Sequence, residues 1–515
     1  MSLWVSAQES EMENRYSGGL LGGQYRPLDP EQIERIHQAA LYILENIGFT
    51  YEQGLDDTLA MLEDAGAKID QAHSIIYFPS GLILSQISKT PERVILCSRD
   101  AQNDIDLWGD RVYMGTGGMA VTVVDIETGQ ARKSCLQDIY NIGRIVDRLD
   151  NIHFYLRPCT AHDVPTSVYD VNCMYTAMQA TTKHYMTGAI DRQSFGDMLA
   201  LASIVAGDEK KLADKPIFSL ITCFAISPLK LCTQSTLNMQ EACRHRIPVA
   251  LSSAPMAGST SPMTMAGTLA QLHAEELVGL TIGQLTHPGA PMLYGGIPGS
   301  ANMRTMGYQG GAVEFGMMNA AIHQLAAHIN VPNYNSSGLT DAKIPDAQAG
   351  WEKAFSSLLA AMGGSNYIHH AAGMLESMLA VAYEQYIIDD EIIGMCTKVL
   401  EGIIVDDEHL AIEAIAEVGP GGNYLMSPHT FEHMRTEFFA GNGITDGRFR
   451  DTWVANGSLD TRERAQEMAR KILENDSSSK IDKRTDKIIR DNFDIKKQPS
   501  NNLHFPTGSD KFQYS

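Results

Sequence analysis

Two hydrophobic patterns alternate along the chain from about residue 110 onward. Short runs of apolar and β-branched residues are each followed by a loop, and then by a stretch in which apolar residues recur every three or four positions. The first pattern is typical of a buried strand and the second of an amphipathic helix. The strand-like runs lie at residues 112–115, 152–156, 184–187, 217–222, 248–251, 292–294, 331–334 and 367–370. The helical stretches lie at residues 136–149, 168–180, 194–205, 234–245, 264–285, 310–328, 350–362 and 375–398.

Eight strand-like runs separated by helices predict a series of parallel βα units. Eight is also the number of strands that closes an α/β barrel, so we expect residues 111–400 to form a (β/α)8 TIM barrel. An open, doubly wound sheet is the alternative, but no G-x-G-x-x-G motif follows a strand-like run to support it.

The regions on either side of this alternating part have other patterns. Residues 1–110 combine helical periodicity with short β-rich runs, and we expect them to form an N-terminal helical and β cap. Residues 401–515 are expected to form a C-terminal helical extension that ends in a loosely held polar tail. The helices expected in this extension lie at residues 406–418, 428–439, 461–475 and 481–493.

The composition excludes several classes of partner. The net charge of −22 at pH 7 argues against nucleic acid, since a phosphate backbone is bound by Lys and Arg. No apolar run reaches the ~18–20 residues that a membrane helix needs. The acidic N-terminus lacks the basic start of a secretory signal, so we expect a cytoplasmic protein with no membrane partner.

The eight cysteines are scattered along the chain, and none form a C-x-x-C pair. Reduced and mostly buried thiols in a cytosolic protein are the simplest interpretation. The closed ligand spacing of a cysteine zinc site is absent, so the sequence predicts no metal.

Several motifs near the ends of the expected strands carry a resemblance to a known family. They are Lys215-Pro-Ile-Phe218, Ser227-Pro-Leu229, Ala266-Gly-Thr-Leu269, the segment 335–350, Gly373-Met-Leu-Glu376 and Glu384-Gln-x-x-Ile-Asp-Asp390. Together they resemble the trimethylamine methyltransferase family, in the branch without pyrrolysine that is similar to glycine betaine:corrinoid methyltransferases.

The resemblance implies a (β/α)8 barrel that associates into a homo-oligomer, a trimer or a hexamer. It implies transfer of a methyl group from an amine to cobalamin carried by a separate corrinoid protein, with no cofactor bound permanently. The active site would then lie at the carboxyl ends of the strands, where small residues leave room for a large group. The residues expected to contact the corrin are Gly117, Gly118, Met256 and Gly258.

Leu339 stands where the founding members of the family carry pyrrolysine, and we expect it to mark the catalytic position. A neutral tertiary amine is a poor methyl donor because an amide-like anion would have to leave. A quaternary ammonium instead releases a neutral tertiary amine, and Co(I) is a strong nucleophile. The protein then has only to exclude water and aim the methyl group at cobalt. Leu339 therefore predicts a quaternary amine substrate, with glycine betaine first and other betaines behind it.

A quaternary ammonium has no hydrogen-bond donor, so its expected host is an aromatic cage with a carboxylate nearby. A betaine carboxylate in turn needs a cation or a donor. Aromatic candidates are Tyr113, Phe154, Tyr155, Phe224, Tyr294, Tyr334 and Tyr367, and candidate donors are Arg157, Arg192, Arg304, His369 and His370. The substrate-binding residues that we favour are His369, His370, Tyr113, Phe224, Tyr334, Tyr155 and Arg304.

Strand alternation limits these assignments. His369 and His370 are adjacent, so at most one of them should point into the barrel. Glu376 could balance the cation as a catalytic residue, or could lie at the N-terminus of its helix as a favourable anion. Asp341 and Lys343 are expected to pair and shape their loop.

Two other functions stay open at this stage. The chain could methylate a corrinoid from a different methylated amine. Without pyrrolysine, it could also be a non-catalytic betaine-binding protein or a scaffold for a corrinoid protein.

Overall fold

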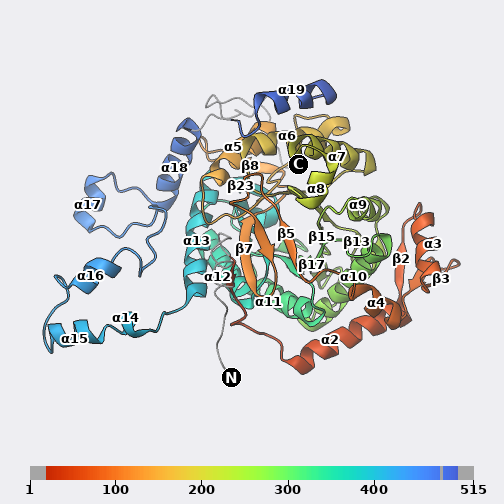
Figure 1. The fold of residues 1–515 in the computed structure, drawn as a ribbon, viewed down its shortest axis with the longest axis horizontal. Helices are drawn as coiled ribbons and strands as arrows, with labels where there is room; N and C mark the ends of the chain where they lie inside the picture. The colour runs from red at the N-terminus through yellow and green to blue at the C-terminus, as the bar shows by residue number, and fades with distance from the viewer. Residues whose placement is uncertain (1–18, 476–478, 497–515) are drawn as a thin grey trace.

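The computed structural model describes residues 19–475 and 479–496 (Figure 1). Within these two ranges no helix is both long enough and apolar enough to cross a membrane. The expectations for the acidic start of the chain and for the tail beyond residue 496 fall outside the described residues.

Eight parallel strands form the centre of a mixed α/β fold, as the hydrophobic alternation predicts. Each pairs with the next in chain order from the second strand to the eighth, and the eighth pairs with the first. The amide of His153 donates to the carbonyl of Met114 at 2.9 Å, which links the first strand to the segment before the second. The strands are β7 (Arg111–Thr116), β10 (Tyr155–Leu156), β11 (Tyr185–Thr187), β12 (Phe218–Thr222), β15 (Val249–Leu251), β17 (Met292–Gly296), β20 (Asn333–Ser336) and β21 (Tyr367–Ala372).

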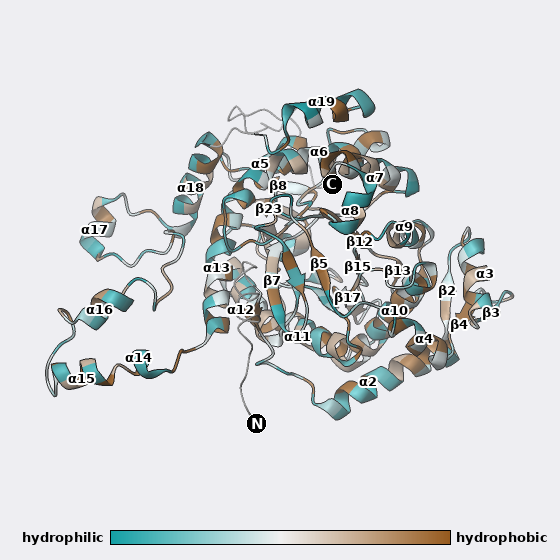
Figure 2. Ribbon diagram, viewed as in Figure 1, coloured by the Kyte–Doolittle hydropathy of each residue, from teal (hydrophilic) through white to brown (hydrophobic). Residues whose placement is uncertain are grey.

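Helices follow these strands and surround them. Helix α12 illustrates the local signals: Asp346 accepts the amide of Ala349 at 3.1 Å at its start, and Gly364, at φ 90°, ends it. Figure 2 shows apolar residues on the inner strands and mixed colours on the covering helices. These helices are α5 (Leu136–Asp147), α6 (Tyr169–Ala180), α7 (Arg192–Ala206), α8 (Glu209–Asp214), α9 (Thr233–Arg244), α10 (Met265–Thr286), α11 (Val313–His328), α12 (Ala347–Gly363) and α13 (Tyr383–Glu401), with a 3-10 turn at Thr166–Val168.

Aromatic side chains pack among the central strands. The buried rings of Phe154 and Tyr367 stack with their centroids 3.6 Å apart, and Tyr334 lies 6.4 Å from Tyr367. Side chains therefore fill the space beside the central strands, and the carboxyl ends of parallel strands are the usual place for a site.

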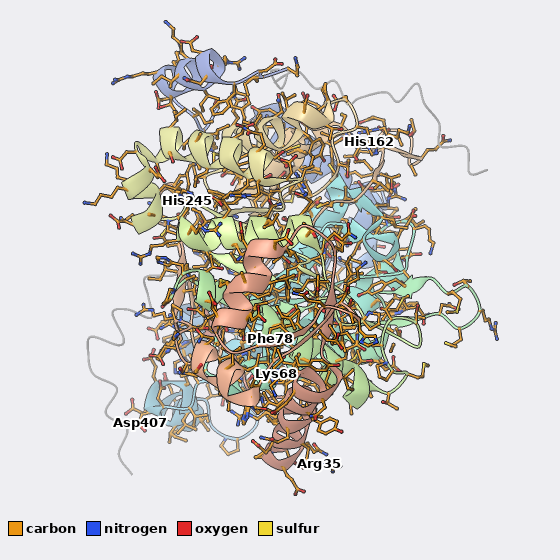
Figure 3. The ribbon with its side chains drawn as sticks, turned by 90° about the vertical axis from the view of Figure 1, so that its right-hand side faces the viewer. Arg35, Lys68, Phe78, His162, His245 and Asp407 are labelled. Carbon is orange, nitrogen blue, oxygen red and sulfur yellow. The ribbon has the colours of Figure 1, made fainter. Side chains whose placement is uncertain are left out.

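The N-terminal region packs against α10 through α2 and α4. Its strands β2, β4 and β3 share a sheet with β13 (Ala225–Ile226) and β14 (Lys230–Leu231), which come from the loop after β12. Figure 3 shows Lys68 and Phe78 in this region from the side. Its elements are β1 (Leu20–Leu21), α2 (Pro30–Tyr42), a π-helix (Ile43–Ile47), β2 (Phe49–Tyr51), α3 (Asp56–Asp64), β3 (Lys68–Asp70), β4 (Ile75–Tyr77), α4 (Ser80–Ile87), β5 (Val94–Leu96) and β6 (Ile105–Leu107).

Two small sheets are built from the loops after the central strands. One has the order β22 (Met374–Leu375), β23 (Ala380–Ala382), β8 (Thr122–Val124) and β9 (Ala131–Lys133). The other has the order β16 (Met256–Ala257), β18 (Gly299–Ala301) and β19 (Tyr308–Gln309).

The expected start of the helix at residue 375 is wrong. Residues 376–378 form a 3-10 turn between β22 and β23, and α13 begins only at Tyr383. Glu376, Ser377 and Met378 all have positive φ, which is incompatible with a right-handed helix and returns the chain as a hairpin.

After α13 the chain leaves the body of the molecule as an arm, residues 402–458, and returns at α18 (Figure 1). Four short helices form the arm, and none contains a buried residue. The helix expected at 406–418 is interrupted at Ala411, whose φ is 50°. The elements are α14 (Asp407–Leu410), α15 (Ile412–Val418), α16 (Pro428–His433) and α17 (Arg450–Ala455), followed by α18 (Thr461–Asn475) and α19 (Lys483–Asn492).

Candidate active site

A cavity of about 290 Å³ lies at the carboxyl ends of the central strands. Its walls come from β10, β12 and β21 and from the loops after β7, β11, β15 and β17. Among the described residues that line it, none is Asp, Glu, Lys or Arg. Leu156, Ile297 and Met378 provide apolar surface, whereas Ser252 and Cys223 provide small polar groups. The cavity therefore suits a small ligand with no net charge.

His369 and His370 both line this cavity, with ring centroids 3.7 Å apart. The expectation that at most one of them faces inward is wrong. The pairing of β21 with β7 shifts register between Ile368 and Ala372, and His370 has a φ of 64°. This irregularity breaks the two-residue alternation and brings both imidazoles to one face.

Hydrogen bonds from two residues of the neighbouring strand β20 hold the two imidazoles in place. The hydroxyl of Tyr334 lies 2.8 Å from Nε2 of His369 and 3.0 Å from Oγ of Ser252. Oγ of Ser336 lies 2.6 Å from Nδ1 of His370. The remaining ring nitrogen of His369, Nδ1, is buried and has no hydrogen-bond partner within the described structure. A buried polar atom without a partner is costly unless a ligand satisfies it.

Both imidazoles are neutral at physiological pH. Burial lowers the pKa of His369 well below its usual value, and the neighbouring His370 lowers it further. Burial also lowers the pKa of His370 to about 3, with a smaller contribution from Lys353. The pair therefore offers hydrogen bonds rather than positive charge.

A buried ion pair supports the loop between β20 and α12. Nζ of Lys353 lies 3.2 Å from Oδ2 of Asp389, and both side chains are fully buried. Lys353 also donates to the carbonyl of Gly338 at 2.5 Å, and Asp389 accepts the amide of Gly373 at 2.6 Å. Burial lowers the pKa of Lys353 and raises the pKa of Asp389 to about 6. The hydrophobic pattern gave neither residue a role, although Asp389 belongs to the motif Glu384-Gln-x-x-Ile-Asp-Asp390.

Two adjacent carboxylates of α10 hold the loops on the other side of the cavity. Glu276 accepts the amides of Ser253 and Gly295, each at 3.1 Å. Glu275 accepts the amide of Leu229 at 3.0 Å and the hydroxyl of Ser227 at 2.8 Å. Burial raises the pKa of both carboxyl groups. No motif in the sequence singled out this pair.

Leu339 is fully buried and is not among the residues that line the cavity. It packs against Gly310, where a methyl group in place of the Gly310 hydrogen would lie 2.9 Å from Cβ of Leu339. The next residues are anchored by α12, because Thr340 Oγ1 donates to Glu352 at 2.6 Å. Lys343 donates to the main-chain carbonyl of Asp341 at 2.5 Å, whereas the Asp341 carboxylate accepts the amide of Gly310 at 3.1 Å.

Glu376 lies at the turn between β22 and β23 and is joined to the same loop, because its amide donates to the carbonyl of Ala342 at 2.9 Å. It is half-buried, and burial raises its pKa while Lys343 partly offsets the shift. It does not line the cavity, although Met378 two positions later does.

The favoured aromatic residues lie elsewhere than the cavity wall. The hydroxyl of Tyr334 is hydrogen-bonded to His369, but Tyr334 does not line the cavity itself. The hydroxyl of Tyr113 packs against Gly19, Tyr155 donates to the carbonyl of Ile139 at 2.6 Å, and the ring of Phe224 packs against Gly279 of α10. Within the described residues, no Phe, Tyr or Trp lines the cavity.

The other expected site residues lie in segments that follow the central strands β7, β15 and β17 along the chain. Gly118 lines the cavity, and a side chain at Gly117 would strike His370. Arg304 lies in the loop between β18 and β19 and is exposed. Met256 is in β16, and Gly258 lies against the sulfur atoms of Met263 and Met303, both largely exposed.

The similarity of this chain to known proteins extends over most of its length. The family model described as "Trimethylamine methyltransferase (MTTB)" matches residues 8–500. The trimethylamine methyltransferase MttB of Desulfitobacterium hafniense (strain DSM 10664 / DCB-2) is 36% identical over 86% of this chain and 88% of that protein. The glycine betaine methyltransferase of Desulfitobacterium hafniense (strain Y51) is 30% identical over 89% of this chain and 94% of that protein. Among solved structures, the Methanosarcina barkeri monomethylamine methyltransferase aligns with 90% of this chain and 97% of its own, at a TM-score of 0.47 and 11% identity.

Proposed function

The chain belongs to the trimethylamine methyltransferase family, and we propose that it moves a methyl group from a quaternary amine to the Co(I) of a corrinoid protein. Glycine betaine or a related betaine is the proposed donor, and the tertiary amine is the product. The similar proteins named above include both a trimethylamine and a glycine betaine enzyme. Similarity alone therefore does not distinguish a neutral amine from a betaine as the substrate, and the distinction has to come from the residues of the cavity.

The observation that carries the proposal is the unpartnered Nδ1 of His369, on a side chain that lines a cavity without formal charges. If the Tyr334 hydroxyl donates to Nε2, the proton of the neutral ring is on Nδ1, which becomes a donor. A donor of this kind satisfies a carboxylate. Betaines carry one and have no net charge, whereas trimethylamine has no carboxylate.

The reaction requires little of the protein beyond binding and orientation. The C–N bond breaks with its electron pair left on nitrogen, and the methyl carbon is bonded to cobalt through the Co(I) electron pair. Leu156, Ile297 and Met378 provide a dry surface for the trimethylammonium end. Leucine at position 339 fits a reaction in which no side chain has to form a bond to the amine. In this proposal Glu376, which lies outside the cavity, balances the positive charge of the ammonium group.

The methyl acceptor, the corrin of the partner protein, is proposed to bind where the central strands end. We propose that the eight strands form a closed barrel, supported by the bond between His153 and Met114, and that the corrin lies over their carboxyl ends. Gly117 and Gly118 would allow close approach, and Met256 with Gly258 would contact the corrin edge. Cobalamin belongs to the partner protein in this proposal, and the chain itself keeps no cofactor.

Association with further copies of the chain, as a trimer or a hexamer, is part of the same proposal. Apolar side chains are exposed along the arm, among them Ile403 at 89%, Met426 at 80% and Phe449 at 89%. So many largely exposed apolar side chains on one segment are typical of a surface that a second copy would bury. Light scattering on the purified protein would measure the mass directly.

The test is to incubate the purified protein with cob(I)alamin and a panel of methylated amines, and to follow methylcobalamin by absorbance. Methylcobalamin formed with a betaine and not with trimethylamine supports the proposal. Formation with trimethylamine alone favours a neutral amine as the donor. Saturable betaine binding without any transfer, also with a corrinoid protein present, would leave the non-catalytic scaffold as the better account.

A further inference from the structure

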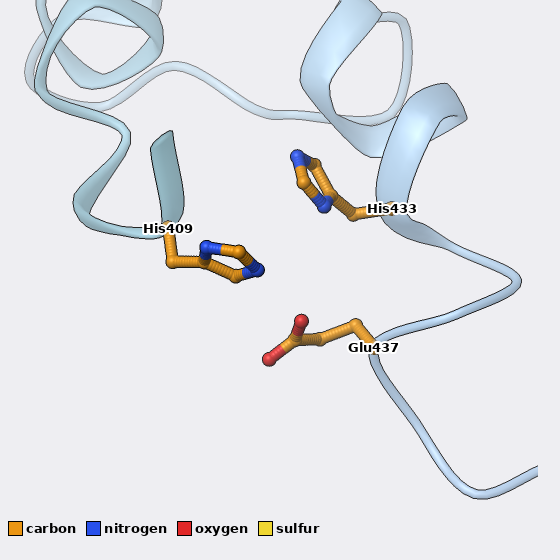
Figure 4. Close-up of side chains that lie close together, drawn as sticks. All are labelled: His409, His433 and Glu437. Carbon is orange, nitrogen blue, oxygen red and sulfur yellow. The ribbon is translucent and has the colours of Figure 1, made fainter. Parts of the chain in front are cut away.

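A second cluster of chemically capable side chains lies far from the cavity, on the arm. It comprises His409 of α14, His433 at the end of α16, and Glu437 just beyond it. One ligand atom from each of the three lies within 4.8 Å of those of the other two. Figure 4 shows the two imidazoles and the carboxylate directed toward one another.

The hydrogen bonds around the cluster leave Nε2 of each of the two imidazoles able to bind a metal. Nδ1 of His409 lies 2.7 Å from Oδ1 of Asp406, which leaves Nε2 of that ring available. An imidazole held by a carboxylate in this way is the usual arrangement of a metal-bound histidine. Nε2 of His433 is buried and has no hydrogen-bond partner within the described structure. It lies 3.7 Å from the carboxylate of Glu408.

We propose that His409, His433 and Glu437 bind a divalent transition metal, with zinc as the best fit and Glu408 as the fourth ligand. Two imidazole nitrogens with carboxylate oxygens are a donor set for zinc, whereas magnesium and calcium prefer oxygen alone. Ligands of a tetrahedral zinc lie roughly 3.4 Å from one another, as follows from bonds of about 2.1 Å. Small side-chain rotations would bring the three groups to that distance.

The position of the site gives the metal a structural task. Helix α14 has four residues and α16 has six, and neither contains a buried residue. Helices this short do not persist in water without tertiary support. A metal bound by ligands at positions 409, 433 and 437 would join the two helices and replace the apolar core that the arm lacks.

The test titrates zinc into the full-length protein after treatment with EDTA, using a chromophoric chelator as competitor. We expect one tight zinc site per chain, weakened at least about tenfold in His409→Ala and in His433→Ala. Asp406→Asn should weaken binding less, because Asp406 orients His409 without binding the metal itself, and Asn can still cap α14. Cobalt(II) in place of zinc should give the visible absorption of a tetrahedral site in the wild type, and this absorption should be lost in His409→Ala and in His433→Ala.

The matched control is His73→Ala. His73 forms the same local pair with Asp70, with Nδ1 and Oδ2 2.8 Å apart, but it is not part of the cluster. This variant should bind zinc as the wild type does.

Limited proteolysis gives a readout that does not depend on the competitor. Zinc should slow cleavage within residues 402–458 of the wild type and leave cleavage of the two histidine variants unchanged. Equal zinc affinity in the wild type and in both variants would overturn the proposal. So would tight binding that is lost in the variants but leaves the arm equally cleavable, because the structural task would then be absent.

Discussion

The hydroxyl of Tyr334 lies 2.8 Å from Nε2 of His369, within hydrogen-bonding distance of the imidazole in the cavity wall. Tyr334→Phe removes this bond and the preference for a proton on Nδ1. Loss of one such bond is worth about 1 kcal/mol, so the affinity for glycine betaine should fall roughly fivefold. Isothermal titration would measure it. Tyr185→Phe removes another buried hydroxyl, one that has no hydrogen-bond partner among the described residues, and should leave the affinity unchanged.

Cys223 is exposed to the cavity, whereas five of the other cysteines are buried. We expect a betaine to slow alkylation of Cys223, because the ligand would occupy the space in front of the thiol. The surrounding cavity wall keeps part of the water away from this thiol and so raises its pKa, and the unprotected reaction should accelerate as the pH rises. Mass spectrometry of the labelled peptide gives the rate, with Cys223→Ser as control. An alkylation rate that does not depend on betaine would mean that the ligand binds elsewhere.

The Lys353 and Asp389 pair should be strongly coupled. Either Lys353→Met or Asp389→Asn leaves a buried group without its partner, at a cost of about 3–5 kcal/mol in unfolding free energy. The double variant should cost less than the sum of the two, and urea unfolding would measure the coupling. Lys398→Met, which breaks the more exposed pair with Glu401, should cost much less, because water screens that pair. Strict additivity of the two buried substitutions would contradict the prediction.

Gly310 and Leu339 should show steric compensation. A methyl group at position 310 would lie 2.9 Å from Cβ and 3.1 Å from Cδ1 of Leu339. Gly310→Ala should therefore cost about 1–3 kcal/mol through overpacking, and Leu339→Ala about 2–5 kcal/mol through a cavity. In the double variant part of the cost should be recovered, as measured by denaturant unfolding. If the double variant loses as much unfolding free energy as the two single variants together, or more, the two residues do not share this space.

His184 should make the protein sensitive to acid. Burial lowers its pKa to about 4, and it is held by the carbonyl of Cys97 and the hydroxyl of Ser219, each at 2.8 Å. Between about pH 4 and pH 6.5 the unfolded chain binds a proton that the folded chain does not, so this contribution to stability falls as the pH falls. From pH 7 to pH 5 the wild type should lose about 2 kcal/mol more than His184→Gln. Equal losses in both proteins would show that His184 is not buried in its neutral form.

Much of the fold follows from local pattern. The run at 217–222 became β12 (Phe218–Thr222), and the stretch at 136–149 became α5 (Leu136–Asp147). These elements are predictable because the spacing of apolar residues depends on the geometry of the element itself. The helix expected from residue 375 failed because positive φ values at residues 376–378 leave no trace in hydrophobic spacing.

The candidate site was predictable only in part. His369 and His370 were expected at the end of a strand, but their shared orientation depends on a register shift against β7. The pairing of Lys353 with Asp389, and of Leu339 with Gly310, joins residues from different elements. No local pattern records such contacts.

The sequence by itself determined the family, the alternation of strands and helices, and the chemical types at the strand ends, because these depend on residue identity and short-range spacing. Only the tertiary structure decided which side chains line the cavity, that they carry no formal charge, and that His409, His433 and Glu437 meet on the arm. The reason is physical: orientation and burial are set by long-range packing, and burial in turn decides whether an imidazole is charged.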